Sequence, residues 1–352
     1  MNLVSLFSGV GGFELGFERV GFKTVFQCEI DRNAAGVLMR HWPDVPKWID
    51  VTTLSGSTVV SVCAEPDCVV FGSPCQDLSV AGRRAGIGGS RSSLFYEAIR
   101  VVKEIREVTN GEYPKWVVWE NVAGALSSNG GNDFGAVLDE MAGAGAVGIE
   151  WAVLDAQYFG VPQRRRRVFV VAGFDSVEWG FRADPLFPVS ESVRGDSKKG
   201  KKKGEVAATG AAACFGIQGN MIGRSDSAGP QGKGYTNVGD PMFTLTSTDV
   251  HGIAKPIGFS HTQGLSAQPS EKAWPTLRVG GSGHAVLNGA MEVRKLTPVE
   301  CERLMGWPDD HTRWHGSGKE QTDGHRYKQC GNGVAAPVAE WVADKIINKV
   351  FF

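Results

Sequence analysis

The chain has 352 residues, a hydrophobic content of 42%, a charged content of 21% and a formal net charge of −1, values typical of a soluble globular protein. No apolar stretch is long enough to span a bilayer, and the first residues lack the basic start of a signal peptide, so we expect a cytoplasmic protein. Seven cysteines without paired spacing, and the lack of a Cys/His cluster with zinc-ligand spacing, argue against a disulfide framework or a metal site.

Short apolar runs alternate with helix-like segments from the first residue to about residue 175, which is typical of an α/β protein with a doubly wound sheet. A segment with helical periodicity covers residues 92–108. The length of the chain favours two domains. We expect strands at residues 3–7, 24–28, 68–71, 116–119, 151–156 and 168–174.

A glycine-rich turn, FSGVGGFELGF, follows the first expected strand. Gly9, Gly11 and Gly12 allow a tight turn and a close approach of the backbone to a ligand at the start of a helix. The turn departs from the dinucleotide fingerprint, because Glu14 occupies its third glycine position. We expect Glu14 to repel a pyrophosphate, which argues against a dinucleotide ligand.

Two acidic residues follow the next apolar segments. Glu29 ends the second expected strand, where a carboxylate can accept hydrogen bonds from a ribose. Asp50 follows Trp48 and Ile49, at a position where it can receive an adenine amino group. Each acid alone is equally compatible with a solvent-facing loop, but together with the glycine turn they predict a nucleoside site.

A cysteine and a glutamate follow adjacent expected strands. The run 69–71 ends in a Gly–Ser–Pro turn that leads directly to Cys75, and Glu120 directly follows the run 116–119. Loops at the carboxyl ends of parallel strands line one crevice, so we expect the thiol and the carboxylate to share it. Taken alone, Cys75 is more typical of a buried structural cysteine.

A basic run, QRRRR, precedes the last of these strands and contains Gln163, Arg165 and Arg167. Guanidinium groups at this point can hold a base edge or a phosphate. The window 163–203 holds eleven Lys/Arg and five Asp/Glu, a local charge of +6, which favours phosphate contacts. A solvated charge run is the simpler interpretation of KKGKKKG alone.

The later part of the chain has a different character. Of the 47 glycines, 18 lie in residues 195–290, a segment that begins with a basic low-complexity linker and predicts short strands and long turns. Helical character then returns: Thr297 begins a capping-box sequence, and residues 334–350 predict a final helix that packs on the first domain.

In these segments the chain resembles the bacterial and phage DNA cytosine-5 methyltransferases. The resemblance is carried, in order, by FSGVGG, GSPCQDLSVAG, ENV, Q-x-R-x-R, LTPVECERLMGWP and GNGVAAPV. It implies a Rossmann-like, S-adenosylmethionine-dependent methyltransferase domain at 1–189 and a smaller, mostly β or irregular target-recognition domain at 190–290. Residues 291–352 are then a hinge segment and a C-terminal helix that returns to the catalytic domain. Double-stranded DNA is the implied partner, without a membrane; the resemblance favours action as a monomer and allows functional pairing with a restriction endonuclease.

The resemblance also implies a mechanism, in which the methyl group of S-adenosylmethionine is transferred to carbon 5 of a flipped-out cytosine without a metal. Cys75 adds to carbon 6 as a thiolate, Glu120 protonates ring nitrogen 3, and Arg165 and Arg167 hold the base oxygen and the catalytic loop. That loop carries three arginines expected to reach phosphates: Arg83, Arg84 and Arg91. The implied cofactor-binding residues are Phe7, Ser8, Gly9, Gly11, Gly12, Phe13, Glu29, Ile30, Asp50, Val51, Asn332 and Val334. Ile30 is a departure, because the family often has an aromatic residue there.

Three alternative functions share some of these motifs. An RNA cytosine-5 methyltransferase has the same motifs, but the long variable domain favours DNA. A nicotinamide-dependent oxidoreductase would explain the glycine turn and Glu29, yet it leaves PCQ, ENV and QRRRR without a role. A binding module that has lost catalysis is disfavoured by the presence of both Cys75 and Glu120.

Overall fold

The computed structural model describes residues 1–63, 65–74, 94–175, 185–187, 215–217, 252–257 and 290–350. Cys75, the loop arginines Arg83, Arg84 and Arg91, and the basic linker lie outside the described residues.

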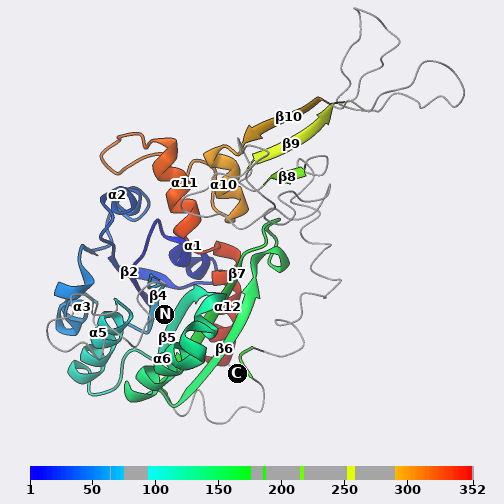
Figure 1. The fold of residues 1–352 in the computed structure, drawn as a ribbon. Coiled ribbons are helices and arrows are strands. Elements are labelled where there is room, and N and C mark those ends of the chain that lie inside the picture. Colours follow the sequence, from blue (N-terminus) through cyan, green and yellow to red (C-terminus); the bar gives the residue numbers. More distant parts are fainter. Residues whose placement is uncertain are drawn as a thin grey trace, which may run out of the picture.

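A seven-stranded sheet forms the centre of the fold, in the order β3-β2-β1-β4-β5-β7-β6 (Figure 1). The five strands from β3 to β5 are parallel, whereas β7 runs antiparallel to both β5 and β6. The expected parallel doubly wound sheet is therefore confirmed for five strands and becomes mixed at β7. The strands are β1 (Asn2–Leu6), β2 (Lys23–Cys28), β3 (Lys47–Trp48), β4 (Cys68–Phe71), β5 (Trp116–Val122), β6 (Gly148–Asp155) and β7 (Arg166–Gly173).

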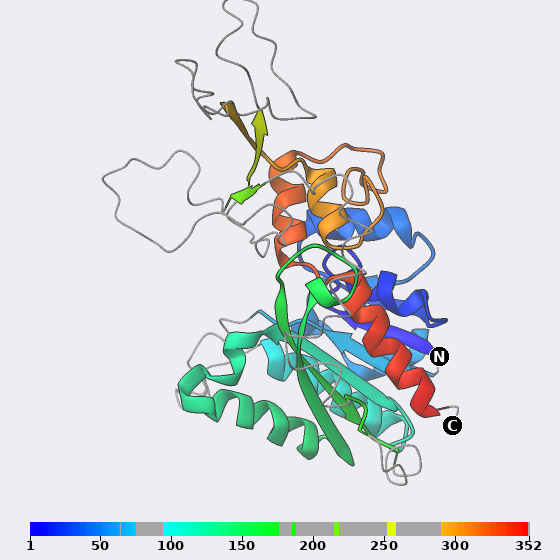
Figure 2. The same ribbon diagram turned by 90° about the vertical axis from the view of Figure 1, so that its right-hand side faces the viewer.

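Helices cover both faces of this sheet. Successive residues of a strand point to opposite faces, so Leu3 and Val70 pack in one apolar cluster while Val4 and Val69 pack in the other. The first cluster includes residues of α1, α2, α10 and α12, and the second includes residues of α3, α5 and α6. Figure 2 shows the strands between α6 on one side and α12 on the other. The larger helices are α1 (Gly12–Glu18), α2 (Arg32–His41), α3 (Gly56–Val62), α5 (Leu94–Val108), α6 (Asn132–Gly143), α10 (Pro298–Leu304), α11 (Asp323–Asn332) and α12 (Ala336–Val350). Short 3₁₀ helices connect them at η1 (Val51–Thr53), η4 (Ala123–Leu126), η5 (Ser128–Gly131) and η6 (Ala156–Tyr158).

The C-terminal helix packs on the first domain as predicted. A Cβ at Gly16 of α1 would lie 2.6 Å from the Cβ of Ala339 in α12, so the glycine lets the two helices approach closely. The helix begins at Ala336, two residues after the predicted start, because Gly333 to Ala335 serve as the turn between α11 and α12.

A second, small sheet is formed by β8 (Phe215–Ile217), β9 (Gly252–Ile257) and β10 (Ala290–Lys295), in the antiparallel order β10-β9-β8. It lies beyond α10 and α11 in Figure 1. These short strands agree with the β character expected of the later segment. From β10 the chain continues into α10, whose predicted capping box is present: the Thr297 hydroxyl accepts from the Glu300 N–H, and Glu300 accepts from the Thr297 N–H at 2.7 Å.

Candidate active site

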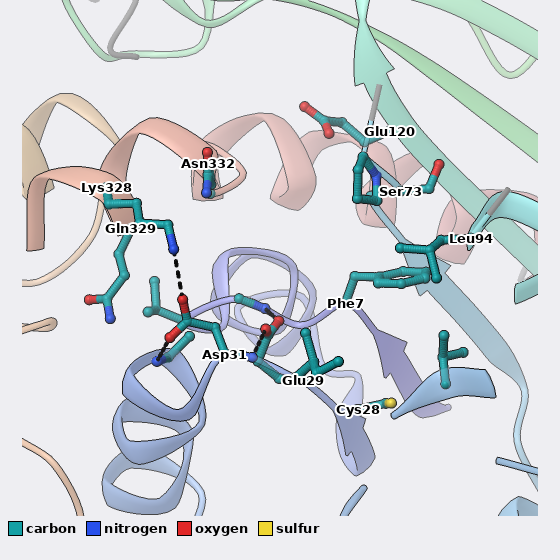
Figure 3. Close-up of a pocket in the computed structure, with 18 of the residues that line it drawn as sticks. Phe7, Cys28, Glu29, Asp31, Ser73, Leu94, Glu120, Lys328, Gln329 and Asn332 are labelled. Carbon is teal, nitrogen blue, oxygen red and sulfur yellow. Dashed lines mark hydrogen bonds and ion pairs between the residues drawn. The ribbon is translucent and has the colours of Figure 1, made fainter. Parts of the chain in front are cut away.

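A pocket of about 470 Å³ lies where the described strands β1 to β5 end and β7 begins. The segments that line it are far apart in sequence but meet at one edge of the sheet, as the order of strands requires. Figure 3 shows this pocket between the β2–α2 turn, the C-terminal end of α11 and the end of β5. The residues that line it include Phe7, Gly9, Glu29, Ile30, Asp31, Ile49, Asp50, Val51, Gly72, Ser73, Pro74, Glu120, Arg167, Lys328 and Asn332.

The turn after β1 forms the floor of the pocket. Phe7 adopts a left-handed φ of 53°, which few residues other than glycine tolerate, and its ring faces the pocket (Figure 3). Gly11 has a φ of 89°, and a Cβ there would collide with the ring of Trp42. The glycine turn thus brings the backbone close both to the pocket and to the residues behind it.

Glu14 does not behave as expected from the sequence. Its side chain is fully buried and accepts a hydrogen bond from Gln27 Nε2 at 3.0 Å, on the side of α1 that faces β2. Burial raises the pKa of Glu14 to about 7. The expectation that Glu14 repels a phosphate at the ligand site was therefore wrong, because helix α1 directs this side chain away from the pocket and towards the core.

Glu29 lies at the end of β2 and orders the turns on either side of it. Its Oε2 accepts from the Gly9 N–H at 2.8 Å, and its Oε1 accepts from the Asp31 N–H at 2.7 Å. Burial raises the pKa of Glu29, although these backbone donors oppose the shift. Each carboxylate oxygen keeps a further lone pair for a ligand hydroxyl, as the ribose prediction requires.

Asp50 begins the turn after β3 and accepts from the Thr52 N–H and hydroxyl at 2.9 and 2.8 Å. This turn is held from below by Arg100 of α5, which donates to the carbonyls of Val51 at 3.0 Å and Leu54 at 2.9 Å. Beside it, Ile30 and Ile49 expose 65% and 69% of their surface while lining the pocket. Two exposed isoleucines next to a fixed carboxylate provide apolar faces and a polar edge for a flat heterocycle.

The end of β4 is fixed by its neighbour β5. Trp119 Nε1 donates to Ser73 Oγ at 3.0 Å, and Asn121 Nδ2 donates to the Ser73 carbonyl at 2.9 Å. Gly72 leaves room for the acid of β5, since a Cβ there would lie 3.2 Å from Glu120 Oε2. The chain therefore reaches Pro74, the residue before Cys75, along a path that β5 holds in place.

Glu120 is buried within β5, and its side chain faces the pocket (Figure 3). Its Oε1 lies 3.1 Å from Nε of Arg167, which stands at the start of β7. Burial raises the pKa of Glu120, while Arg167 and Arg165 oppose the shift. A carboxyl group that resists ionisation can supply a proton to a substrate.

Arg165 is buried and faces a different partner. Its Nη2 donates to the carbonyls of Gly331 and Gly333, at 2.9 and 2.7 Å, on both sides of Asn332. Burial and Arg167 lower the pKa of Arg165 to about 9. Arg165 thus supports the end of α11 from behind, and Arg167 is the member of the basic run that lines the pocket.

The twelve predicted cofactor residues divide into two groups. Seven line the pocket, namely Phe7, Gly9, Glu29, Ile30, Asp50, Val51 and Asn332. Five others lie behind it and shape its wall: Ser8 donates to the Ser5 carbonyl, Gly11 packs under Trp42, Gly12 packs on the Val334 backbone, and Phe13 and Val334 are buried in the core.

Sequence reasoning missed a pair of charged pocket residues. Lys328 Nζ of α11 lies 3.0 Å from Asp31 Oδ2 in the β2–α2 turn, and both residues line the pocket. Asp31 carried a detectable signal, since an acid just before a helix is a common N-cap. Lys328 carried none, because nothing in the sequence pairs it with a residue 297 positions away.

The part of the chain that the structure describes offers neither a membrane span nor a metal site. It contains no helix long and apolar enough to cross a membrane. It also has no group of three or more His, Cys, Asp or Glu side chains placed to hold a metal ion.

Comparison with known proteins identifies relatives along most of the chain. A family model described as C-5 cytosine-specific DNA methylase matches residues 1–348. A DNA N-6-adenine-methyltransferase of Escherichia phage P1 is 28% identical over 98% of this chain, which spans 61% of that protein. Type II methyltransferase M2.BsuMI of Bacillus subtilis (strain 168) is 29% identical over 98% of this chain and 75% of its own length. Type II methyltransferase M.Bsp6I of Bacillus sp. (strain RFL6) is 27% identical over 98% of both chains.

Solved structures share the fold. The S. pombe Dnmt2 methyltransferase aligns over 100% of both chains with a TM-score of 0.63 and 17% identity. A putative DNA modification methyltransferase encoded within an E. coli prophage aligns over 99% of both chains with a TM-score of 0.57 and 21% identity.

Proposed function

Because the chain belongs to the C-5 cytosine-specific DNA methylase family, we propose that it methylates carbon 5 of a cytosine in a specific double-stranded DNA sequence, through a covalent adduct between Cys75 and carbon 6. The observation that carries the proposal is the position of Glu120. Its buried carboxyl group faces the pocket beside Arg167, next to the turn that leads to Cys75.

The residues present fit S-adenosylmethionine. Asp50, Ile49 and Ile30 suit an adenine, and the Glu29 carboxylate suits the hydroxyls of a ribose. The volume of about 470 Å³ lies within the range of small-molecule sites. When bound, S-adenosylmethionine supplies an electrophilic methyl group on its sulfonium.

The protein must make carbon 5 of cytosine nucleophilic, which we assign to three of its side chains. The Cys75 thiolate adds to carbon 6, and Glu120 donates a proton to ring nitrogen 3, so that the ring becomes a neutral enamine with electron density at carbon 5. Once the proton has left, the positive charge of Arg167 stabilises the Glu120 carboxylate. After methylation, a water molecule takes the carbon 5 proton, and the bond between carbon 6 and sulfur breaks with Cys75 leaving as a thiolate. Ring nitrogen 3 returns its proton to the Glu120 carboxylate, so that the neutral aromatic ring is restored.

This chemistry requires the cytosine to leave the base stack. A thiol cannot reach carbon 6 inside a duplex, so the base must be extruded into the space between Pro74 and Glu120. The thiols of the five described cysteines, at 28, 63, 68, 301 and 330, are buried, and burial raises the pKa of each. Such thiols are poor nucleophiles, which leaves Cys75 and Cys214, and of these two Cys75 directly follows the turn at the end of β4 beside Glu120.

We assign sequence recognition to residues 190–290. The separation between a catalytic pocket at the sheet edge and a second small sheet supports a division of labour, in which one part reads base edges and the other performs the chemistry. The names of the Type II relatives support a role beside a restriction endonuclease.

A methylation assay that identifies the modified base tests the proposal. Purified protein is incubated with S-adenosylmethionine and genomic DNA, or with total RNA, and the digested nucleosides are separated by mass. We expect 5-methylcytosine in DNA. N6-methyladenine in place of it would instead match the named activity of the phage P1 relative, and 5-methylcytosine confined to RNA would favour the RNA alternative.

A further inference from the structure

Figure 3 shows Cys28, Glu120 and the pair of Asp31 and Lys328 on three different sides of the pocket. One end, beside Cys28, is formed by Ile49 and Asp50 of the turn after β3. A second end contains Glu120, above Phe7. The third is closed by the ion pair between Asp31 and Lys328, on the opposite side of Glu29 from Cys28.

S-adenosylmethionine also has three arms around its ribose and sulfur. Adenine suits the end with Ile49 and Asp50, and the methyl group must point towards Glu120 for transfer to the base. The remaining arm is a zwitterionic α-amino acid, with one ammonium and one carboxylate group. The remaining end of the pocket contains one carboxylate and one ammonium group, in Asp31 and Lys328.

The charges of the pocket favour the same match. Among the described residues that line it, Arg167 and Lys328 are the two cations, and Arg167 is paired with Glu120. Lys328 exposes 52% of its side chain, so its ammonium group can hold a second acceptor beside Asp31. It is therefore the described cation best placed to meet a ligand carboxylate.

Asp31 is held rigidly as an anion. Its Oδ1 accepts from the N–H groups of Asn33 and Ala34 and so caps helix α2, which leaves Oδ2 facing Lys328. Burial opposes its ionisation, but Lys328 and the two backbone donors outweigh this and lower the pKa of Asp31.

We propose that Asp31 and Lys328 bind the α-amino-acid arm of the cofactor, with Lys328 on its carboxylate and Asp31 on its ammonium group. This inference rests on the proposed function, because it names a subsite for the same ligand. In addition to joining α11 to the β2–α2 turn, the ion pair then favours cofactors that carry both the amino and the carboxylate group.

Decarboxylated S-adenosylmethionine provides the sharpest test, since it keeps the sulfonium and the amine and lacks only the carboxylate. Calorimetry measures its dissociation constant and that of S-adenosylmethionine for the wild type and for Lys328→Met. We expect the substitution to raise the dissociation constant of S-adenosylmethionine about tenfold, the usual effect of losing one charge-assisted hydrogen bond. The dissociation constant of decarboxylated S-adenosylmethionine should stay within about twofold of the wild-type value. Asp31→Asn keeps the helix cap and should raise the dissociation constants of both ligands by a similar factor, because both ligands carry the amine.

Lys103→Met is the matched control, because Lys103 is an exposed lysine paired with Glu140 at 2.8 Å, outside the pocket. It should change neither dissociation constant. Equal weakening of both ligands by Lys328→Met, or of neither, would contradict the inference while leaving the proposed function intact. A wild-type protein that binds neither ligand would overturn the proposed function and this inference together.

Discussion

Glu120 Oε1 and Arg167 Nε lie 3.1 Å apart on neighbouring strands that run in opposite directions. Because β7 is antiparallel to β5, its first residues stand beside the last residues of β5, and Val122 pairs with Arg167 in the register. A parallel β7 would have placed this arginine at the far edge of the sheet. The direction of one strand thus brings a cation to the acid that must give up and regain a proton.

Glu120→Gln should reduce the rate of methyl transfer by roughly 10²–10⁴-fold, because an amide cannot donate the proton that ring nitrogen 3 requires. The variant keeps the shape of the side chain and should leave the dissociation constant of S-adenosylmethionine nearly unchanged. Single-turnover kinetics on a duplex substrate measure the rate. Glu340→Gln, at a surface pair with Arg19, is the control and should react like the wild type.

Glu14 should make the protein less stable as the pH rises. Its pKa in the folded state is about 7, against 4.5 for the ordinary side chain, so the folded protein binds the proton more tightly than the unfolded chain. Stability from this group is complete below pH 4.5 and is lost as the pH rises through 7, by about 3 kcal/mol. Urea unfolding at pH 5 and pH 8 should show a smaller decrease for Glu14→Gln than for the wild type. An identical decrease in both proteins would contradict this assignment.

Arg326→Met should destabilise the C-terminal segment strongly. Glu302 is fully buried and accepts from Arg326 Nη2 at 2.9 Å, from Asp310 N–H at 2.7 Å and from Thr312 N–H at 2.9 Å. Loss of the arginine leaves a buried carboxylate without its counter-ion, which costs about 3 kcal/mol or more. Arg303→Met, which removes an exposed pair with Asp309, should leave the unfolding midpoint unchanged.

Gly11→Ala should cost more stability than Gly21→Ala, although both positions have a φ near 90°. The left-handed backbone alone costs an alanine about 1–2 kcal/mol at each site. At Gly21 a Cβ meets nothing within 4 Å, whereas at Gly11 it overlaps the ring of Trp42, which adds about 1–3 kcal/mol. Equal midpoints in thermal unfolding would show that Trp42 moves aside without cost.

Local sequence patterns predicted the strands and the capping box well. The run at 68–71 became β4 with the same bounds, because a short apolar segment between turn residues has few alternatives to a buried strand. β5 extends three residues beyond its predicted end, through Glu120 to Val122, because the ladder with β7 satisfies these polar positions. Glu14 was misjudged for a similar reason: its surroundings depend on how α1 packs against β2.

Contacts between distant segments were harder to predict. Arg165 is adjacent in sequence to other arginines, yet its guanidinium reaches the carbonyls around Asn332, a contact that only the packing of α11 creates. The pairing of Lys328 with Asp31 has the same origin. Motif order could place Glu29, Asp50 and Glu120 at one edge of the sheet, because strand ends follow from topology, but it could not reveal which cations meet them.

The addition of Cys75 to carbon 6 of the target cytosine can be trapped with 5-fluorocytosine. Fluorine cannot leave as a cation, so a fluorinated target should be methylated and never released. We expect a denaturation-resistant complex between the protein and a duplex containing 5-fluorocytosine at its site, formed only with S-adenosylmethionine and attached to the peptide that contains Cys75. Cys75→Ser should abolish the complex, because a hydroxyl is far less ionised than a thiol at neutral pH. Methylation of the ordinary site by a protein whose Cys75 peptide stays unmodified by the fluorinated duplex would show that Cys75 is not the nucleophile.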